Sequence, residues 1–190
     1  MQHRTEHGEL ATYRIDSICS GRTGAWLRIH FSSETFMQKY TAAIVGGLIA
    51  GVVTTAVMVA GRKSGVLTKT LDRDAVDWID DVTGSRAVIG DAGTSAVEFV
   101  NHLGASAAFA AAVPKLRELA PSLSPAAIGT LYGTALYAVN IGAIAPVLGI
   151  TEGEVAAGPR KAGERWAIHV LQAVVTAVLA DRFTGPSRRR

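Results

Sequence analysis

Residues 40–61 form an unbroken run without a charged side chain, YTAAIVGGLIAGVVTTAVMVAG. The hydrocarbon core of a bilayer is about 30 Å thick, and a helix of about 20 apolar residues crosses it. A helix that faces water on one side needs a polar stripe, and this run has none. Residues 40–61 therefore predict a transmembrane helix.

Three more segments have the length and composition of membrane spans, namely residues 96–113, 126–149 and 166–181. The second of them is uncharged throughout, and the third begins with Trp166, a residue type that favours the membrane interface. Only 18% of the chain is charged, against about 25% in an average soluble domain, and the mean hydropathy is +0.25. We predict an all-α integral membrane protein, a bundle of four transmembrane helices.

The segments outside the spans differ in kind. Residues 1–36 are polar and carry charges of both signs, so they predict a disordered tail, or an extension upstream of a true start at Met37. The membrane domain covers residues 37–183, and residues 184–190 form a basic tail. The first apolar run is longer than the apolar region of a secretory signal and lacks an A-x-A cleavage site, which favours a retained anchor.

The segment between the first two spans predicts a short amphipathic helix. Its apolar residues recur at helical spacing and its aspartates fall mostly on other faces. The apolar residues are Leu71, Ala75, Val76, Trp78, Ile79 and Val82, and the aspartates are Asp72, Asp74, Asp77, Asp80 and Asp81. We expect this helix to lie on the bilayer surface with Trp78 inserted and the acidic face in water. The aspartate spacing does not match a calcium-binding loop, and the single cysteine excludes a multi-cysteine cage, so we predict no metal site.

The charge of the chain does not indicate a nucleic-acid partner. The isoelectric point is about 9.2, but the net charge is only +3 and the basic excess is concentrated in Arg188, Arg189 and Arg190. A terminal arginine run without aromatic residues is not typical of a nucleic-acid-binding surface. An even number of spans puts both termini on one side; the basic residues of the two sides nearly balance, and the arginine tail favours cytoplasmic termini.

Small residues recur at every fourth position in two of the predicted spans. Gly47 and Gly51 form a G-x-x-x-G pair in the first span, and Gly129 and Gly133 form one in the third. Membrane helices associate where small residues let their backbones approach closely. We therefore predict that these four glycines are helix-packing positions, either within the chain, in a homo-oligomer or against a membrane partner.

Four polar residues are predicted to form one layer below one membrane face, and they are Glu98, His102, Asn140 and His169. Ser95 and Glu98 have the spacing of a capping box, which predicts a helix start with Glu98 at the interface. His102 lies about 6 Å deeper, at a rise of 1.5 Å per residue. The second and fourth spans run in the same direction and the third ends on the same side, so His169 and Asn140 fall at a similar depth.

The two intramembrane histidines allow three interpretations. Polar groups at this depth are costly unless they are paired or face water, and they often mark functional sites. His102 and His169 would bridge neighbouring helices by hydrogen bonds, form a proton-responsive or substrate-lining site, or hold a haem between them. The haem interpretation requires the two imidazoles to face each other across the cofactor, and no cofactor is favoured.

The second half of the chain resembles a known family in scattered positions. The shared elements are a G-x-x-Y-G at residues 129–133, Asn140, a break at Pro146 and Leu148-Gly149, and the pair Glu164 and His169. With these elements the chain resembles the YagU-like family of small bacterial inner-membrane proteins, over about a third of its length. The resemblance implies a protein of the bacterial inner membrane and brings no established active site with it.

The sequence contains none of the common enzyme motifs, such as G-x-S-x-G, H-E-x-x-H, a P-loop or a dinucleotide-binding fingerprint. We therefore predict a membrane protein that is not an enzyme, either a transporter-like component or a pH-responsive accessory component. The alternatives are a redox protein with a haem between two histidines, or a structural subunit of a membrane complex. The expected partners are the lipid bilayer and a second copy or another membrane protein.

Overall fold

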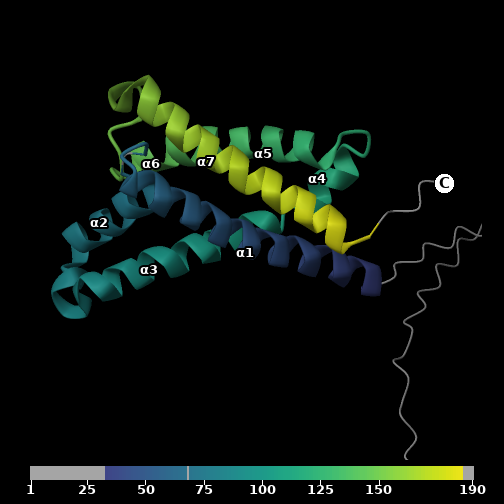
Figure 1. Ribbon diagram of the computed structural model, residues 1–190, viewed down its shortest axis with the longest axis horizontal. Helices are drawn as coiled ribbons and strands as arrows, with labels where there is room; N and C mark the ends of the chain where they lie inside the picture. The colour runs from purple at the N-terminus through teal and green to yellow at the C-terminus, as the bar shows by residue number, and fades with distance from the viewer. Residues whose placement is uncertain (1–32, 68, 186–190) are drawn as a thin grey trace, which may run out of the picture. The chain divides into compact units, whose positions relative to one another are not determined.

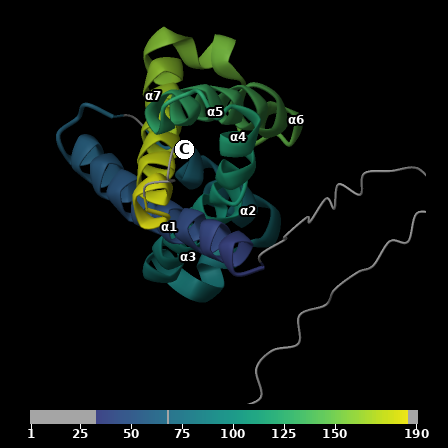
Figure 2. The ribbon, with the colours of Figure 1, turned by 90° about the vertical axis from the view of Figure 1, so that its right-hand side faces the viewer.

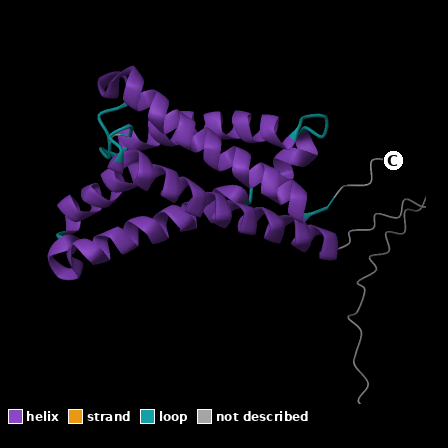
Figure 3. Cartoon of the chain, viewed as in Figure 1, coloured by secondary structure: helices purple, strands orange, loops and turns teal. Residues whose placement is uncertain are grey.

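The computed structural model describes residues 33–67 and 69–185, and this part of the chain contains helices and turns but no strand (Figure 1, Figure 3). The helices are α1 (Ser33–Lys63), α2 (Leu71–Thr83), α3 (Ser85–Ala110), α4 (Val113–Leu119), α5 (Pro125–Val139), α6 (Ala145–Val147) and α7 (Glu154–Phe183), with a π-helical turn η1 (Asn140–Ile144) between α5 and α6. The predictions for residues 1–32 and 186–190 lie outside the described residues.

Four described segments are long and apolar enough to cross a membrane, namely Phe36–Lys63, Ser85–Leu119, Pro125–Val147 and Glu154–Phe183. The short helix α2 lies between the first two of them, as the amphipathic pattern predicted. The predicted fold, an all-α bundle of four membrane-crossing helices, is confirmed. The chain is a multi-pass membrane protein by the length and composition of these helices.

The second and fourth of these helices begin earlier in the sequence than their apolar stretches. α3 begins at Ser85 and is interrupted by non-helical backbone at Gly90 (φ 68°, ψ 178°), and α7 is interrupted in the same way at Gly158 (φ 80°, ψ 165°). Ser95 therefore lies inside α3, so the predicted capping box at Ser95 and Glu98 is wrong. A capping box needs backbone N–H groups without helical partners. α3 begins before Ser95, so the N–H groups that follow Ser95 already have helical partners.

The four long helices pack in the order α5, α7, α1, α3, as two views of the ribbon show (Figure 1, Figure 2). Glycines lie at two of these contacts. A Cβ atom on Gly47 would lie 2.7 Å from the Ser106 carbonyl oxygen of α3, and one on Gly133 would lie 2.7 Å from the His169 carbonyl oxygen of α7. Gly51 and Gly129 make equally close approaches to the same two helices. The four glycines thus lie at contacts within the chain.

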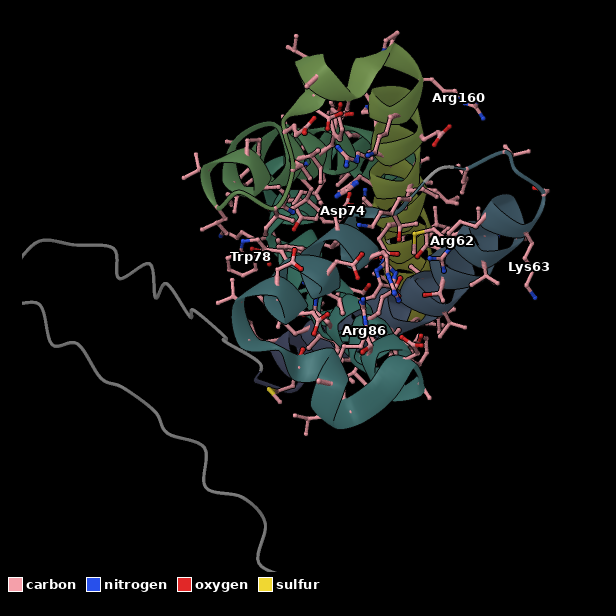
Figure 4. All side chains as sticks on the ribbon, turned by 90° about the vertical axis from the view of Figure 1, so that its left-hand side faces the viewer. Arg62, Lys63, Asp74, Trp78, Arg86 and Arg160 are labelled. Carbon is pink, nitrogen blue, oxygen red and sulfur yellow. The ribbon has the colours of Figure 1, made fainter. Side chains whose placement is uncertain are left out.

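The start of α1 and the end of α7 lie at one end of the bundle, which we call the terminal end. Lys39 of α1 pairs with Glu118 of α4 at 3.7 Å, and Arg117 of α4 pairs with Asp181 of α7 at 2.9 Å. The opposite end, which we call the loop end, holds α2 and the starts of α3 and α7. Figure 4 views the molecule from this loop end and shows Asp74 near its middle and Lys63 at its rim.

Candidate functional site: a cavity with a polar end

A cavity of about 270 Å³ lies between α2, α3, α5, η1 and α7. Its walls are mostly apolar along the bundle and become polar where α2 closes the loop end. The apolar lining includes Met58, Leu67, Leu71, Phe109, Tyr132, Leu136, Ile144, Ile150 and Ile168. Phe109 and Ile144 are 40% and 47% exposed, so two residues of the apolar lining also reach the surface of the bundle.

Side chains from four helices meet in a hydrogen-bonded chain at the polar end. The Nδ1 atom of His102 on α3 lies 3.0 Å from Oδ2 of Asp72 on α2, and its Nε2 atom lies 3.1 Å from the Thr54 hydroxyl on α1. The same hydroxyl lies 2.6 Å from Oε1 of Gln172 on α7. The Gln172 amide nitrogen donates to the carbonyl of Gly47 at 3.3 Å. We call these side chains, Thr54, Asp72, His102 and Gln172, the His102 chain.

The directions of these hydrogen bonds determine where the protons lie. The Gly47 carbonyl can only accept, so it fixes which end of the Gln172 amide carries the nitrogen, and Oε1 must accept from Thr54. The Thr54 hydroxyl has one proton to give, and the Ala50 and Gly51 carbonyls at 2.9 and 3.1 Å compete for it with Gln172; in each case the hydroxyl oxygen accepts from His102 Nε2–H. Asp72 as a carboxylate accepts from Nδ1–H. All four bonds are made when His102 carries a proton on each nitrogen and forms an ion pair with Asp72.

Arg165 of α7 anchors a second polar group beside the His102 chain. Its side chain is only 5% exposed, and its two terminal nitrogens lie 2.6 Å from Glu154 and 2.9 Å from Asp74. Tyr137 of α5 donates to the other oxygen of Glu154 at 2.6 Å, and Lys69 pairs with Asp74 at 3.0 Å. An arginine removed from water requires such acidic partners, because an unpaired buried charge is strongly unfavourable.

Three of the four residues predicted to form the polar layer line this cavity. His102, Asn140 and His169 are all part of its lining, although they come from three different helical segments. Glu98 lies outside the cavity and pairs at 3.6 Å with Arg62 and at 3.6 Å with Arg73. Glu98 is therefore paired with two arginines and does not cap a helix.

His102 and His169 share the cavity but do not bond to each other. Both nitrogens of His102 are taken by Asp72 and Thr54. His169 donates Nδ1–H to the Arg165 carbonyl at 2.8 Å, and its ring lies edge-on to Tyr137 with centroids 6.1 Å apart. Its Nε2 atom is then the acceptor of the neutral ring.

The arrangement does not fit the predicted alternative of a haem between two histidines. Each axial histidine needs a free ring nitrogen for iron. His169 has one in Nε2, but His102 would have to give up either Thr54 or Asp72. Within the described residues there is also no group of three or more His, Cys, Asp or Glu side chains placed to hold a metal ion.

The predicted solvated acidic face of α2 is wrong for most of its aspartates. The side chains of Asp72, Asp74, Asp77 and Asp80 are between 11% and 26% exposed and each has a basic partner, whereas Asp81 is exposed. The helical period places Asp74, Asp77, Asp80 and Asp81 on one side of α2 and Asp72 among its apolar residues. It does not reveal that cations of α3, α7 and the α1–α2 loop lie opposite most of these aspartates. α2 closes the loop end of the cavity with Leu71, Asp72 and Ala75.

Two of these loop-end groups have altered pKa values. The Asp77 carboxylate accepts a hydrogen bond from Lys69 at 2.7 Å and another from Arg86, and these bonds lower its pKa to about 2. The same hydrogen bond raises the pKa of Lys69, although partial burial opposes the change. Both groups are therefore charged throughout the physiological range.

Sequence reasoning did not single out Thr54, Gln172 and Arg165. Thr54 and Gln172 are uncharged polar residues in apolar runs, where such residues are common enough to carry little signal. Arg165 directly precedes Trp166, the first residue of the predicted fourth span, and so falls outside that span. Its place one residue before a predicted span is a signal in the sequence, because a cation in a membrane-crossing helix needs a partner.

Comparisons of the chain with protein-family models, with curated proteins and with solved structures find no match. The resemblance to the YagU-like family therefore stays a prediction. The function has to be argued from the cavity and its polar end.

Proposed function

We propose that the protein binds a small amphipathic molecule in its intramembrane cavity and acts as a transporter-like component. The observation that carries this proposal is the cavity of about 270 Å³ with apolar walls and one polar end. Small-molecule sites are typically concave and mostly apolar, with a few convergent polar groups that orient the ligand. The His102 chain and Arg165 supply such groups here, and ionisable residues inside a membrane domain often mark substrate pathways.

Access to the cavity favours a ligand that partitions into lipid. Phe109 and Ile144 line the cavity and are also exposed on the apolar surface of the bundle. A molecule dissolved in the bilayer would enter past such an exposed apolar lining residue instead of through the charged loop end. We propose the bacterial inner membrane as the location, and the family resemblance alone supports this. We also propose that both termini lie in the cytoplasm, because the C-terminal arginine tail favours that side.

The test is to fill the cavity with a larger side chain and to measure which small molecules remain bound to the purified protein. Ala105 of α3 lines the cavity, whereas Ala108 of the same helix is exposed and does not. Native mass spectrometry of the purified protein should detect a bound small molecule on wild type and on Ala108→Leu, and not on Ala105→Leu. The same bound species on all three proteins, or no bound species on wild type, would contradict the proposal.

A pH-responsive role is the second candidate, and the His102–Asp72 pair favours it. This pair joins α2 to the membrane-crossing helix α3 at 3.0 Å, and it is an ion pair only when the imidazole is protonated. The other ionisable groups facing His102 are Glu98 on its own helix and Arg165 and His169 on α7. Protection factors of the α2 amides, in which the intrinsic rise of exchange with pH is divided out, should fall from pH 5 to 8 in wild type. They should be low and independent of pH in His102→Gln; equal profiles in both proteins would exclude this role.

A further inference from the structure

We propose that the polar end of the cavity binds the head of an uncharged amphiphile through carbonyl-type oxygen atoms, with Thr70 and Arg165 as the donors. The proposal rests on the proposed ligand-binding function and names its substrate class. The apolar body of the ligand would lie along the apolar lining that α3, α5 and α7 contribute.

Two buried donors at this end have no partner within the described part of the chain. The Thr70 hydroxyl and the Arg165 Nε–H group are buried, and neither has a hydrogen-bond partner among the described residues. Thr70 is 9% exposed and the Arg165 side chain 5%, and both residues line the cavity. Buried polar groups in native proteins are nearly always hydrogen-bonded, so two unpartnered donors at one cavity end indicate an acceptor that binds there.

The position of the free Arg165 donor follows from the ion pairs around it. Arginine often binds a carboxylate with two parallel hydrogen bonds. Asp74 gives one oxygen to an Arg165 terminal nitrogen at 2.9 Å and the other to Lys69 at 3.0 Å. Glu154 takes the remaining terminal nitrogen at 2.6 Å. Nε–H is thus left over because Lys69 holds the second oxygen of Asp74.

The charges at the polar end favour a neutral head group. Each charged side chain that lines the cavity has an oppositely charged partner, and the pairs are Lys69 with Asp74, Asp72 with His102, Glu164 with Arg160, and Arg165 with Glu154. A charged ligand head would bring a charge without a free counterion into a poorly hydrated site, which is costly. A carbonyl oxygen has two lone pairs and no charge, so it can accept from the free donors without disturbing these pairs.

The experiment compares three probes that share a decyl chain and differ in the head: a decyl-substituted benzoquinone, decanoate and decyltrimethylammonium. Titration calorimetry on the full-length protein in uncharged detergent at pH 7 measures each dissociation constant. We expect the quinone to bind at least tenfold more tightly than either charged probe. Tighter binding of decanoate or decyltrimethylammonium that is lost in Ala105→Leu would overturn the neutral-head assignment and support the cavity as a ligand site. No binding of any probe would overturn the assignment, and the proposed function then falls only if native mass spectrometry also finds no ligand.

A pair of matched variants tests the donor itself. Thr70→Val removes the free hydroxyl in the cavity, and Thr151→Val removes another buried hydroxyl without a partner, one that does not line the cavity. Neither variant breaks a hydrogen bond of the protein, so both should keep the wild-type melting temperature. The quinone should bind about tenfold more weakly to Thr70→Val, the cost of one hydrogen bond, and with unchanged affinity to Thr151→Val. Equal affinities for the two variants would show that Thr70 is not a ligand contact.

Discussion

Nδ1 of His102 lies 3.0 Å from Oδ2 of Asp72, and this pair joins an apolar membrane-crossing helix to the short helix that closes its cavity. The His102 side chain is 13% exposed and that of Asp72 is 21% exposed, so water screens the pair only in part. The other His102 nitrogen contacts Thr54 of α1. One imidazole therefore connects α1, α2 and α3, which makes α2 part of the membrane domain's packing.

Asp72→Asn should loosen α2, because the protonated imidazole of His102 loses its anionic partner. Removing one member of a buried ion pair costs 3–5 kcal/mol, and with the partial exposure of Asp72 we expect about 2 kcal/mol of unfolding free energy. Asp81→Asn on the same helix is the control, since Asp81 is exposed. Amide hydrogen exchange should rise across α2 in Asp72→Asn alone. Unchanged exchange in that variant would show that the pair does not hold α2.

Thr54→Val should destabilise the bundle through the two groups that it leaves unpartnered. The Thr54 hydroxyl is fully buried and lies between His102 and Gln172, at 3.1 and 2.6 Å. Each buried polar group without a partner costs about 1–3 kcal/mol, so the free energy of unfolding in mixed micelles should fall by at least about 2 kcal/mol.

The adjacent residue provides the control for Thr54→Val. The Thr55 hydroxyl is buried and has no hydrogen-bond partner among the described residues. Thr55→Val is the same chemical change one position along α1, and it should change the unfolding free energy by less than about 0.5 kcal/mol. Equal losses in the two variants would mean that the His102 chain contributes nothing beyond packing.

Asp77→Asn should lower stability in a manner that depends on pH. Hydrogen bonds from Lys69 and Arg86 lower the Asp77 pKa to about 2, whereas an unfolded chain has a pKa of about 3.9. A lowered folded-state pKa stabilises the protein above the unfolded pKa, and the stabilisation is lost as the pH falls through the folded pKa. Wild type should exceed Asp77→Asn by at most about 1 kcal/mol at pH 7, since the side chain is partly exposed. Melting curves should converge between pH 4 and pH 2, and a difference that stays constant over that range would contradict the assignment.

Gly133→Ala should weaken the contact between α5 and α7. A Cβ atom there would lie 2.7 Å from the His169 carbonyl oxygen and 2.7 Å from the Val170 Cα atom, and both belong to backbone that cannot rotate away. Overpacking of this kind costs about 1–3 kcal/mol. Gly104→Ala in α3 is the control, because a Cβ atom there meets nothing within 4 Å. The melting temperature of Gly133→Ala should be lower than that of Gly104→Ala in the same detergent. Equal melting temperatures would refute the close contact.

The sequence predicted the elements and the depth of the polar residues, because both follow from one-dimensional rules. Runs without charge give the membrane-crossing helices, and a rise of 1.5 Å per residue puts His102 and His169 at matching depth. Depth does not give the direction in which a side chain points. His102 and His169 share a cavity, as equal depth allowed, yet His102 bonds to Thr54 and Asp72 instead of His169.

The predictions that were wrong concern the groups that polar side chains contact. The period of α2 separates most of its aspartates from its apolar residues, but Asp72 and Asp74 face Lys69, His102 and Arg165 instead of water. Ser95 and Glu98 match a capping box, but only a helix start makes that match meaningful, and α3 continues through both. Local patterns thus identified faces and spacings, and the identity of the opposing surface required the tertiary structure.

The arrangement of the helix ends leads to a prediction about topology. Leu123 follows α4 at the terminal end, whereas Lys63 ends α1 at the loop end, and both are exposed. With cytoplasmic termini, Lys63→Cys should react in intact cells with a maleimide that cannot cross membranes, and Leu123→Cys should react only after permeabilisation. Both are made in a Cys19→Ser background, since Cys19 is the single native cysteine. The reverse labelling would place the termini outside. Labelling of both positions in intact cells would contradict opposite ends, because charged loops at the two ends of a bundle of membrane-crossing helices must lie on opposite sides of the bilayer.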